Sequence, residues 1–405
     1  MRVAVAVVAL LVSGCSLMAR PNAPLEFHRA YWSEGTALAP DDGDYELNAL
    51  AFSSPDEGWV VGNRFALHIQ GEQLQVAFLR PRHLSFWDVD LASAIGGAAV
   101  GYHTAGWSEA TSGAALHYDG AYWQPDAVPA ELFPSWWIQR VAAVPDGADR
   151  AIGAVFANPR EAQIVPIPSA VEKHLLRRAA GGWTVDPAAT DAAWRPNDLC
   201  TTAAGETWMV GATQRGGRRF EALAARASGD TWVVEPLPPL GGDAATLSRV
   251  VCPPAGGIVA LGGVRHEGVP RIELVLLRFT DHWQRIALPD DGVTADAVIA
   301  ALSVDDVWLA QACLTPAACQ TRALHWHNGQ WSALAAPLLP SGRASGYSFA
   351  DMQFVAPDEG WAVANDYGGG GLTRGLLFHY RNGTWRVRSW NWHFWNQPGF
   401  GWFGD

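Results

Sequence analysis

The chain carries one short phrase near both of its ends. "SPDEGW" at 54–59 returns as "APDEGW" at 356–361, and the flanking residues, "LAFSSPDEGWVVG" and "MQFVAPDEGWAVA", are also similar. In each copy a turn-forming sequence leads into a tryptophan that opens an apolar run, which is typical of two antiparallel strands joined by a tight turn. A unit that recurs so far along the chain predicts an array of repeated units.

A second landmark indicates how many units there are. The tryptophans after the turn are Trp59, Trp208, Trp308 and Trp361, and "AAVG" near 98–101, "AIGA" at 151–154 and "IVALG" at 258–262 fill the intervening places. Further along each unit, a segment such as "ALHYDGAYW" ends on another tryptophan, which Leu74 replaces in the first unit. These landmark tryptophans are Trp123, Trp183, Trp232, Trp283, Trp331 and Trp385. The alignment predicts seven units.

Each unit contains four strand-like runs in about 50 residues, the content of one propeller blade. We therefore predict an all-β chain that folds as a seven-bladed β-propeller of four-stranded antiparallel blades. The expected blades are 45–80, 86–128, 137–188, 197–238, 247–289, 297–337 and 349–390. Short apolar runs separated by 42 glycines and 26 prolines, without a long helical period, predict almost no helix.

The repeated phrase is interpreted as a structural joint. Pro55 and Asp56 favour a tight turn, Gly58 permits a positive φ, and the Trp59 ring is expected to lie between neighbouring sheets. The acids of "DEG" are predicted to form turns rather than a catalytic pair. Because the phrase marks the first and last blades, these two are expected to meet where the ring closes.

The segment "EFHRAYWSEGTALAP" at 26–40 resembles the fourth strand of a unit. It could pair with the last blade and latch the ring, or it could be a fifth strand or a cover. The first 14 residues are predicted to be a signal peptide, 15–44 a lipid-anchored linker with this possible latch, 45–390 the propeller and 391–405 an aromatic tail.

The N-terminus predicts export. After Arg2, "VAVAVVALLV" is an apolar run too short to span a bilayer, and "VSGC" at 12–15 resembles the bacterial lipobox, in which Cys15 would be acylated. We expect a lipid anchor at Cys15 in the cell envelope, either the outer membrane, which Ser16 favours, or the outer face of the cytoplasmic membrane. Such a compartment permits disulfides. A local bridge between Cys313 and Cys319 is expected, whereas Cys200 and Cys252 could be bonded between adjacent blades or be two buried thiols.

Histidines recur at one place in the repeat. His68, His117, His325 and His379 are equivalent residues on the third strands, with Arg177, Arg226 and Arg278 in other units. Third strands of neighbouring blades lie too far apart to share a metal ion, so hydrogen bonding between blades or partial burial is expected. His325 and His327 share a strand face and could form a weak two-ligand site, but no metal and no cofactor are predicted.

Catalytic motifs are not recognisable. "SSPDEGW" matches only part of the sialidase Asp box, and the chain has no G-x-S-x-G, Walker loop, H-E-x-x-H or C-x-x-C. We predict that the protein is not an enzyme. The net charge of -12 argues against nucleic acid as a partner. The tail could pack on the propeller or dock on a partner protein, and its candidate contact residues are Trp390, Trp392, Trp395, Phe400 and Trp402.

The blade phrases "DEGWVVG" and "ALHYDG-x-x-W" resemble the repeats of the photosystem II stability and assembly factor family, which are related to Asp-box repeats. The resemblance spans 45–390. It implies a seven-bladed propeller, a lipoprotein as in cyanobacterial members, and a protein-binding role as accessory subunit or assembly factor of a membrane complex. The chain departs from the family in "HYDGAYW" and "HYRNGTW", where the family has T-x-D-G-G-x-T-W, so no functional residue is carried over. The alternatives are a carbohydrate-binding or glycoside-hydrolysing propeller, which would have acids and arginines around its central channel, and a structural envelope lipoprotein.

Overall fold

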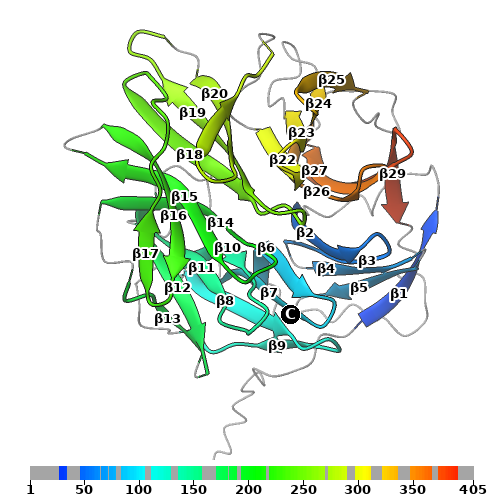
Figure 1. Cartoon of the computed structure of the whole chain (residues 1–405). Coiled ribbons are helices and arrows are strands. Elements are labelled where there is room, and N and C mark those ends of the chain that lie inside the picture. Colours follow the sequence, from blue (N-terminus) through cyan, green and yellow to red (C-terminus); the bar gives the residue numbers. More distant parts are fainter. Residues whose placement is uncertain are drawn as a thin grey trace, which may run out of the picture.

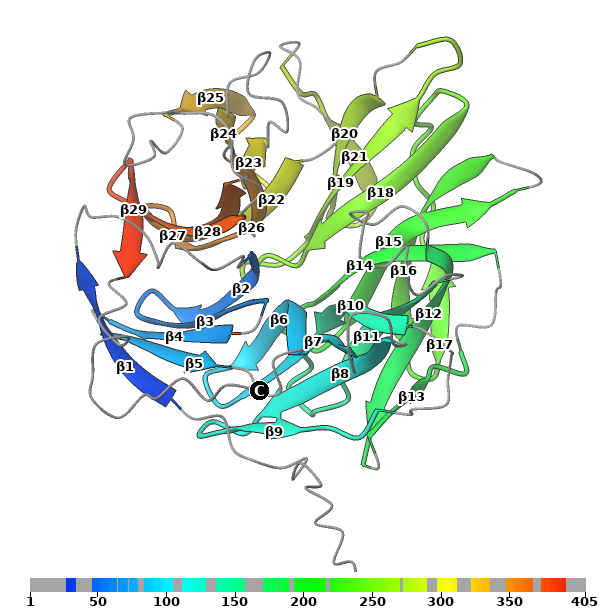
Figure 2. The same cartoon turned by 180° about the vertical axis from the view of Figure 1, so that it is seen from behind.

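The computed structural model confirms a seven-bladed β-propeller with antiparallel four-stranded blades and, in the described residues, no helix (Figures 1 and 2). Accordingly, the described part of the chain contains no helix that could cross a membrane. The structure describes residues 27–33, 46–63, 65–71, 73–78, 84–104, 111–128, 136–156, 170–180, 182–188, 193–215, 219–269, 272–289, 297–311, 322–335, 347–366 and 373–390.

The blades follow one another in chain order around the channel. Blade one contains β2 (Leu47–Ser54), β3 (Glu57–Gly62), β4 (Phe65–Gln70) and β5 (Gln73–Phe78). Blade two contains β6 (Leu84–Ser93), β7 (Gly96–Thr104), β8 (Thr111–Tyr118) and β9 (Trp123–Pro125). Blade three contains β10 (Trp136–Ala142), β11 (Arg150–Phe156), β12 (Ala170–Ala179) and β13 (Gly182–Val185).

Blade four contains β14 (Trp194–Thr201), β15 (Thr207–Gln214), β16 (Phe220–Ser228) and β17 (Thr231–Val234). Blade five contains β18 (Ala244–Val251), β19 (Ile258–Arg265), β20 (Ile272–Phe279) and β21 (Trp283–Ile286). Blade six contains β22 (Ala297–Ser303), β23 (Asp306–Gln311), β24 (Arg322–His327) and β25 (Gln330–Leu334). Blade seven contains β26 (Tyr347–Ala356), β27 (Glu359–Asp366), β28 (Arg374–Arg381) and β29 (Thr384–Trp390).

The hydrophobic core is a series of layers between blades. Side chains alternate along a strand, so the two faces of each sheet can pack on different neighbours. On β2, Leu50 and Phe52 join a buried cluster with residues of blade seven, whereas Ala49 and Ala51 join one with residues of blade two. Both faces of a blade are therefore apolar, which explains why the strands lack a clear polar–apolar alternation.

The second-strand tryptophans lie in these layers. Trp59 packs edge-on against Trp123 of blade two, with ring centroids 5.4 Å apart, and Trp361 stacks on Phe52 of blade one at 5.0 Å. Trp308 stacks in the same way on Phe354 of blade seven, and Trp208 packs against Phe279 of blade five. Each of these rings thus joins its own blade to the next one.

The landmark tryptophans of the fourth strands connect each blade to the one before it. Trp183 Nε1 donates to Asp126 Oδ2 at 3.1 Å, and Trp232 Nε1 donates to Asp186 Oδ2 at 3.2 Å. Trp331 Nε1 donates to the carbonyl of Ala287 at 2.7 Å. All three acceptors directly follow the fourth strand of the preceding blade. Trp123, Trp283 and Trp385 are buried as well.

The glycine of the repeated phrase has a different role from the expected one. Gly58 does not adopt a positive φ. A Cβ at Gly58 would lie 2.4 Å from the ring of Phe52, and one at Gly360 would lie 2.7 Å from the ring of Phe354. The positive φ that glycine permits is therefore not used here, and the glycine is needed because an aromatic ring lies directly against the backbone.

The N-terminal strand β1 (Phe27–Ser33) spans the junction of the first and last blades. It pairs antiparallel with β5 from Phe27↔Ala77 to Tyr31↔Gln73, and its end pairs with β29 at Trp32↔Trp390 and Ser33↔Ser389. Figure 1 shows β1 along the outer edge of blade one with its end near β29. The two alternatives for this segment are thus combined, because β1 is both a fifth strand and a latch.

A disulfide joins two blades near the channel. Cys200 of β14 is bonded to Cys252, which directly follows β18, with Cα atoms 5.6 Å apart. The inner strands of adjacent blades are therefore close enough for a bridge. The expected Cys313–Cys319 bridge, Cys15 and the tail residues Trp392, Trp395, Phe400 and Trp402 lie outside the described residues, and Trp390 ends β29.

We predict that removing the Cys200–Cys252 bond lowers the free energy of unfolding. The bond closes a loop of sequence separation 52, for which chain entropy gives a loss of about 2–4 kcal/mol. Urea unfolding of the wild type and of the Cys200→Ala/Cys252→Ala variant, followed by tryptophan fluorescence, measures this difference. A reductant should lower the midpoint of the wild type more than that of the variant, in which only the expected Cys313–Cys319 bridge can respond; equal midpoints without reductant would contradict the prediction.

Candidate functional site

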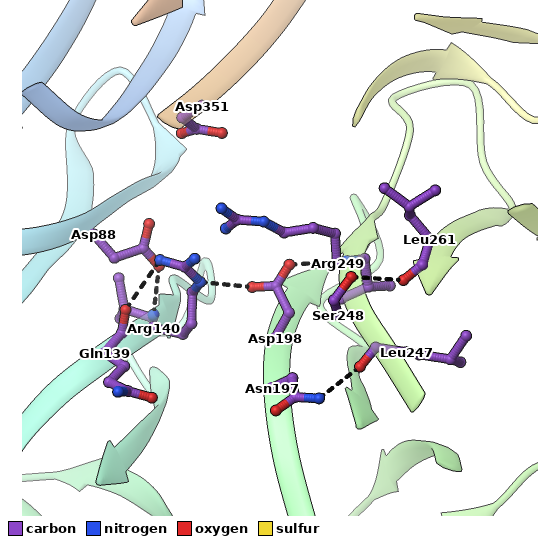
Figure 3. A network of polar contacts seen from close by, with 12 residues as sticks. Asp88, Gln139, Arg140, Asn197, Asp198, Leu247, Ser248, Arg249, Leu261 and Asp351 are labelled. Atoms are coloured by element: carbon purple, nitrogen blue, oxygen red, sulfur yellow. Dashed lines mark hydrogen bonds and ion pairs between the residues drawn. The ribbon is translucent and has the colours of Figure 1, made fainter. Parts of the chain in front are cut away.

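The central channel contains a ring of charged side chains. Inner strands of all seven blades line a cavity of about 200 Å³. At one level five charged residues project into it from five different blades (Figure 3), and they are Asp88, Arg140, Asp198, Arg249 and Asp351, whereas Asp90 lines the cavity at a second level. In blades one and six the equivalent residues are Ala49 and Val298, so the charges follow part of the ring only.

A β-bulge places each charged residue. The register of the inner strand shifts directly before Asp88, and the same shift precedes the other four charged residues. A bulge bends its strand and re-aims the following side chain. The same local distortion therefore brings five residues, which are far apart in the sequence, to one level of the channel.

The carboxylates satisfy backbone groups of the next blade. An inner strand is an edge strand, and its channel-side N–H groups have no partner strand. Asp88 Oδ2 accepts the Val141 N–H at 2.8 Å, Asp198 Oδ2 accepts the Val250 N–H at 2.9 Å, and Asp351 Oδ2 accepts the Leu50 N–H at 3.0 Å. Each acid thus fastens the blade that follows its own.

A second level of fastening lies two residues further along the same strands. Asp90 Oδ2 accepts the Ala143 N–H at 2.9 Å, and Gln353 Oε1 accepts the Phe52 N–H at 2.7 Å. Cys200 occupies the equivalent position in blade four, where it forms the disulfide to blade five. A carboxylate, an amide and a disulfide therefore serve the same purpose at three blade junctions.

The two arginines connect blades that these acids do not fasten. Arg140 Nε lies 3.3 Å from Asp198 Oδ1, which joins blades three and four. Arg249 Nη2 donates to the carbonyl of Ala350 at 3.2 Å, and its side chain extends from β18 into the channel toward blade seven (Figure 3). The guanidinium groups therefore brace the ring as well as carrying its positive charge.

Burial strongly shifts the pKa values in the ring. The pKa of Asp88 is raised to about 8 by burial, against the lowering influence of Arg140 and with further raising by Asp198 and Asp351. Burial raises the pKa of Asp90 to about 6 and also raises the pKa of Asp351. Near neutral pH Asp88 is therefore mostly protonated, which lowers the negative charge that faces the two guanidinium groups.

The pKa values of the two arginines shift in opposite directions. Burial and the nearby Arg140 charge lower the pKa of Arg249. For Arg140 burial acts in the same direction, but the carboxylates of Asp88 and Asp198 outweigh it and the pKa is raised. Both groups remain cationic at physiological pH because a guanidinium group is not deprotonated in proteins. The ring thus contains both acids and guanidinium groups rather than side chains of one charge.

A second recurring arrangement lies further from the channel, where a histidine stacks on a tryptophan and binds an acid. The His68 ring is 4.0 Å from Trp59, and its Nε2 is 2.5 Å from Glu57 Oε1. His379 stacks on Trp361 at 3.9 Å and hydrogen-bonds Glu359 in the same way. The acids of "DEGW" were expected only to form turns, but their glutamates also bind histidines. The histidines were expected to form hydrogen bonds between blades or to be partly buried, but these two hydrogen bonds lie within one blade.

The other units vary this arrangement. His325 stacks on Trp308 and binds Asp306, whereas His117 binds Asp126. Arg226 replaces the histidine in blade four, where it pairs with Glu206 at 3.1 Å. Two arginines do bridge adjacent blades, namely Arg177 to Asp230 and Arg278 to Asp305.

A surface groove lies between blades four and five, on the face where second and third strands are connected. Its volume is about 570 Å³, and its lining includes Arg219, Asp243, Arg265, Glu267 and Val269. Val269 is 48% exposed, and Ile272 at the start of β20 is 41% exposed. Among the described residues, the exposed side chains of Arg219 and Arg265 have no hydrogen bond or ion pair, whereas Asp243 accepts the Glu267 N–H.

The raised pKa of Asp88 predicts how stability depends on pH. A carboxyl with a pKa of about 8 in the folded state and 3.8 as the reference value binds its proton more tightly when folded, so folding loses stability as pH rises between these values. Asp88→Asn cannot ionise, and its amide oxygen can still accept the Val141 N–H. We expect this variant to gain about 1–3 kcal/mol relative to the wild type between pH 5 and pH 8.

Urea unfolding at a series of pH values measures this gain. Asp56→Asn, in an exposed turn of blade one, is the control and should follow the wild-type pH profile. Parallel profiles for Asp88→Asn and the wild type would show that Asp88 has no raised pKa.

Comparisons with known proteins support the fold. No protein-family model matches the chain, and no curated protein matches it. Among solved structures, it is similar to a puromycin hydrolase mutant (TM-score 0.55, 13% identity, 87% of this chain and 56% of that one) and to a streptogramin B lyase (TM-score 0.50, 10% identity, 90% and 98%). It is also similar to YCF48 bound to a peptide, at a TM-score of 0.48 and 16% identity over 85% of this chain and 99% of that one. At such identities the likeness shows the fold alone.

Proposed function

We propose that this protein is a non-enzymatic, exported propeller that binds a partner protein, as accessory subunit or assembly factor of a membrane complex. The groove between blades four and five carries this proposal. It combines two arginines that have no partner among the described residues with the exposed apolar side chain of Val269, and the exposed Ile272 is paired with Arg265 at its border. Arginine is enriched in protein–protein interfaces, and exposed apolar groups gain free energy when a partner covers them.

The groove suits an extended segment of polypeptide. Its volume lies in the range of ordinary binding clefts, and the two guanidinium groups can each donate several hydrogen bonds to carbonyl or carboxylate oxygens. The acids in its lining leave the groove without a large net charge. A partner with mixed polar and apolar side chains is therefore favoured over a strongly charged polymer.

The chemistry of the channel supports binding over catalysis. Asp88, Asp198 and Asp351 already accept backbone N–H groups of the neighbouring blades. A general acid or base has to transfer its proton to a substrate within hydrogen-bond reach. Carboxylates that hold the blades together are poorly placed for this, because moving them toward a substrate would release the edge N–H groups.

A photocrosslinking amino acid in place of Val269 tests the proposal in the cells that make the protein. We expect one partner protein to be crosslinked at this position. The adduct should be lost when Arg219→Glu and Arg265→Glu are combined with the crosslinker, because the partner's oxygens would then meet two carboxylates. Val234, 50% exposed on β17, is the matched control position. Equal adducts at both positions, or adducts that survive the charge reversal, would contradict the proposal.

The anchor is a separate prediction. We propose that Cys15 carries the acyl chains that hold the propeller at the cell envelope, because it follows a short apolar run and small residues. Cys15→Ser should abolish incorporation of labelled palmitate and shift the protein from the membrane to the soluble fraction. Cys252→Ser serves as the control and should keep the label. Membrane retention of the Cys15→Ser protein would argue for another mode of attachment.

A small-molecule site in the channel is the second candidate function. The ring has the acids and arginines expected of a ligand-binding or glycoside-hydrolysing propeller, and Asp88 is protonated near neutral pH, as a general acid must be. The cavity of about 200 Å³ is small for this role. If the channel is the functional site, Asp88→Asn should abolish activity or ligand binding. If the groove binds the partner, the same variant should still form the crosslink at Val269.

A further inference from the structure

Blade six differs from its neighbours in one cluster of side chains. Asp306 begins β23, and His325 and His327 lie two residues apart on the paired strand β24. Asp306 Oδ1 is 2.6 Å from His325 Nε2 and 3.3 Å from His327 Nδ1. One ligand atom of each side chain lies within 4.8 Å of the others, and no other such group of three occurs in the described part of the chain.

The register of the two strands explains why these side chains converge. Asp306 is directly opposite His327, and His325 is opposite Trp308. Residues two apart on a strand point to the same side of the sheet, so both imidazoles are on the side of the Asp306 carboxylate. The stack of His325 on Trp308, with ring centroids 4.3 Å apart, fixes the orientation of the first imidazole.

The equivalent sites of blades one and seven have a glutamate in place of Asp306 and the same stacked histidine, but no second histidine. Gln70 is opposite Glu57, and Arg381 is opposite Glu359. In blade seven that arginine forms an ion pair with the acid, at 3.3 Å. Blade six replaces it by an imidazole, whose lone pair can bind a cation.

We propose that Asp306, His325 and His327 bind one divalent transition-metal ion, with Zn²⁺ the favoured species. A carboxylate and two imidazoles are borderline ligands that suit Zn²⁺, Cu²⁺, Ni²⁺ or Co²⁺ better than Mg²⁺ or Ca²⁺. Bonds of about 2.0–2.1 Å place tetrahedral ligand atoms about 3.3 Å apart, which small side-chain rotations from the observed separations achieve. Three protein ligands leave the fourth position to water or to a side chain of a bound partner.

The site is accessible without opening the propeller. The His327 side chain is 56% exposed, whereas that of Asp306 is 12% exposed. An ion can therefore enter from the solvent side and find a carboxylate that is largely shielded from competing water. The site lies in a different blade from the groove of blades four and five, so it does not depend on the proposed partner binding.

Isothermal titration of Zn²⁺ into the full chain, purified without a polyhistidine tag, tests the proposal. We expect the wild type to bind one equivalent in a saturable manner, and His327→Gln to weaken the affinity by more than about tenfold. Because His327 is exposed, this variant should keep the far-ultraviolet circular dichroism of the wild type. His68→Gln, which removes the equivalent stacked histidine of blade one, is the control and should bind Zn²⁺ like the wild type.

Substitution of Co²⁺ for Zn²⁺ gives an independent readout. A four-coordinate nitrogen and oxygen site should produce visible absorption bands that saturate at one equivalent, and these bands should be absent from the His327→Gln spectrum. The proposal is overturned if the wild type shows no saturable binding. It is equally overturned if His327→Gln binds with the wild-type affinity, because the ion would then be held elsewhere.

Discussion

The unpaired backbone N–H groups of the inner strands are the constraint on which this propeller depends. Every blade ends at the channel in an edge strand, and unsatisfied buried N–H groups are costly. In three blades an aspartate of one inner strand accepts an N–H of the next, from Asp88 to Val141, Asp198 to Val250 and Asp351 to Leu50. The same bonds that satisfy the backbone also set the spacing of neighbouring blades, so the charged ring and the closed fold have one cause.

This bracing works together with the aromatic layers further out. A blade that packs only through Trp59, Trp208, Trp308 or Trp361 could slide on its neighbour, because stacked rings have little directional preference along their faces. The hydrogen bonds at the channel are directional and fix the position of each sheet. At the outer edge β1 adds a strand to blade one and pairs with β29, so blades one and seven are joined at both the inner and the outer ends of their sheets.

The sequence predicts the repeat well and the site poorly. Tryptophans such as Trp59 and Trp361 recur at a nearly constant spacing, so they establish the number of blades and the closure of the ring. The charged ring was missed, although its signal is present: Asp88 in "WDVDL" and Arg140 in "IQRVA" interrupt inner strands that are otherwise apolar. The sequence does not reveal that a bulge precedes each of these residues or that their partners are backbone groups of another blade.

The role of Gly58 could not be predicted for a similar reason. A glycine after a turn suggests a positive φ, but the structure requires it because the Phe52 ring lies against its backbone. Phe52 is directly opposite Gly58 in its hairpin, as Phe354 is opposite Gly360, so the contact follows from a strand register that becomes known only with the structure. Cys200 and Cys252 were likewise recognised as candidates for a bond between adjacent blades, while the bond itself depended on the distance between two inner strands.

A comparison of equivalent residues distinguishes the side chains that hold blades together from those that can bind a ligand. Asp90, Gln353 and Cys200 occupy one position of the repeat, and each bonds to the next blade. A carboxylate, an amide and a disulfide can therefore all attach one blade to the next. His327 differs from its counterparts Gln70 and Arg381 without any such need, because Asp306 is already hydrogen-bonded to His325. The fold does not require a second imidazole at this place, because Gln70 and Arg381 occupy it in blades one and seven. The chemistry of this imidazole is explained by a cation that all three side chains can share.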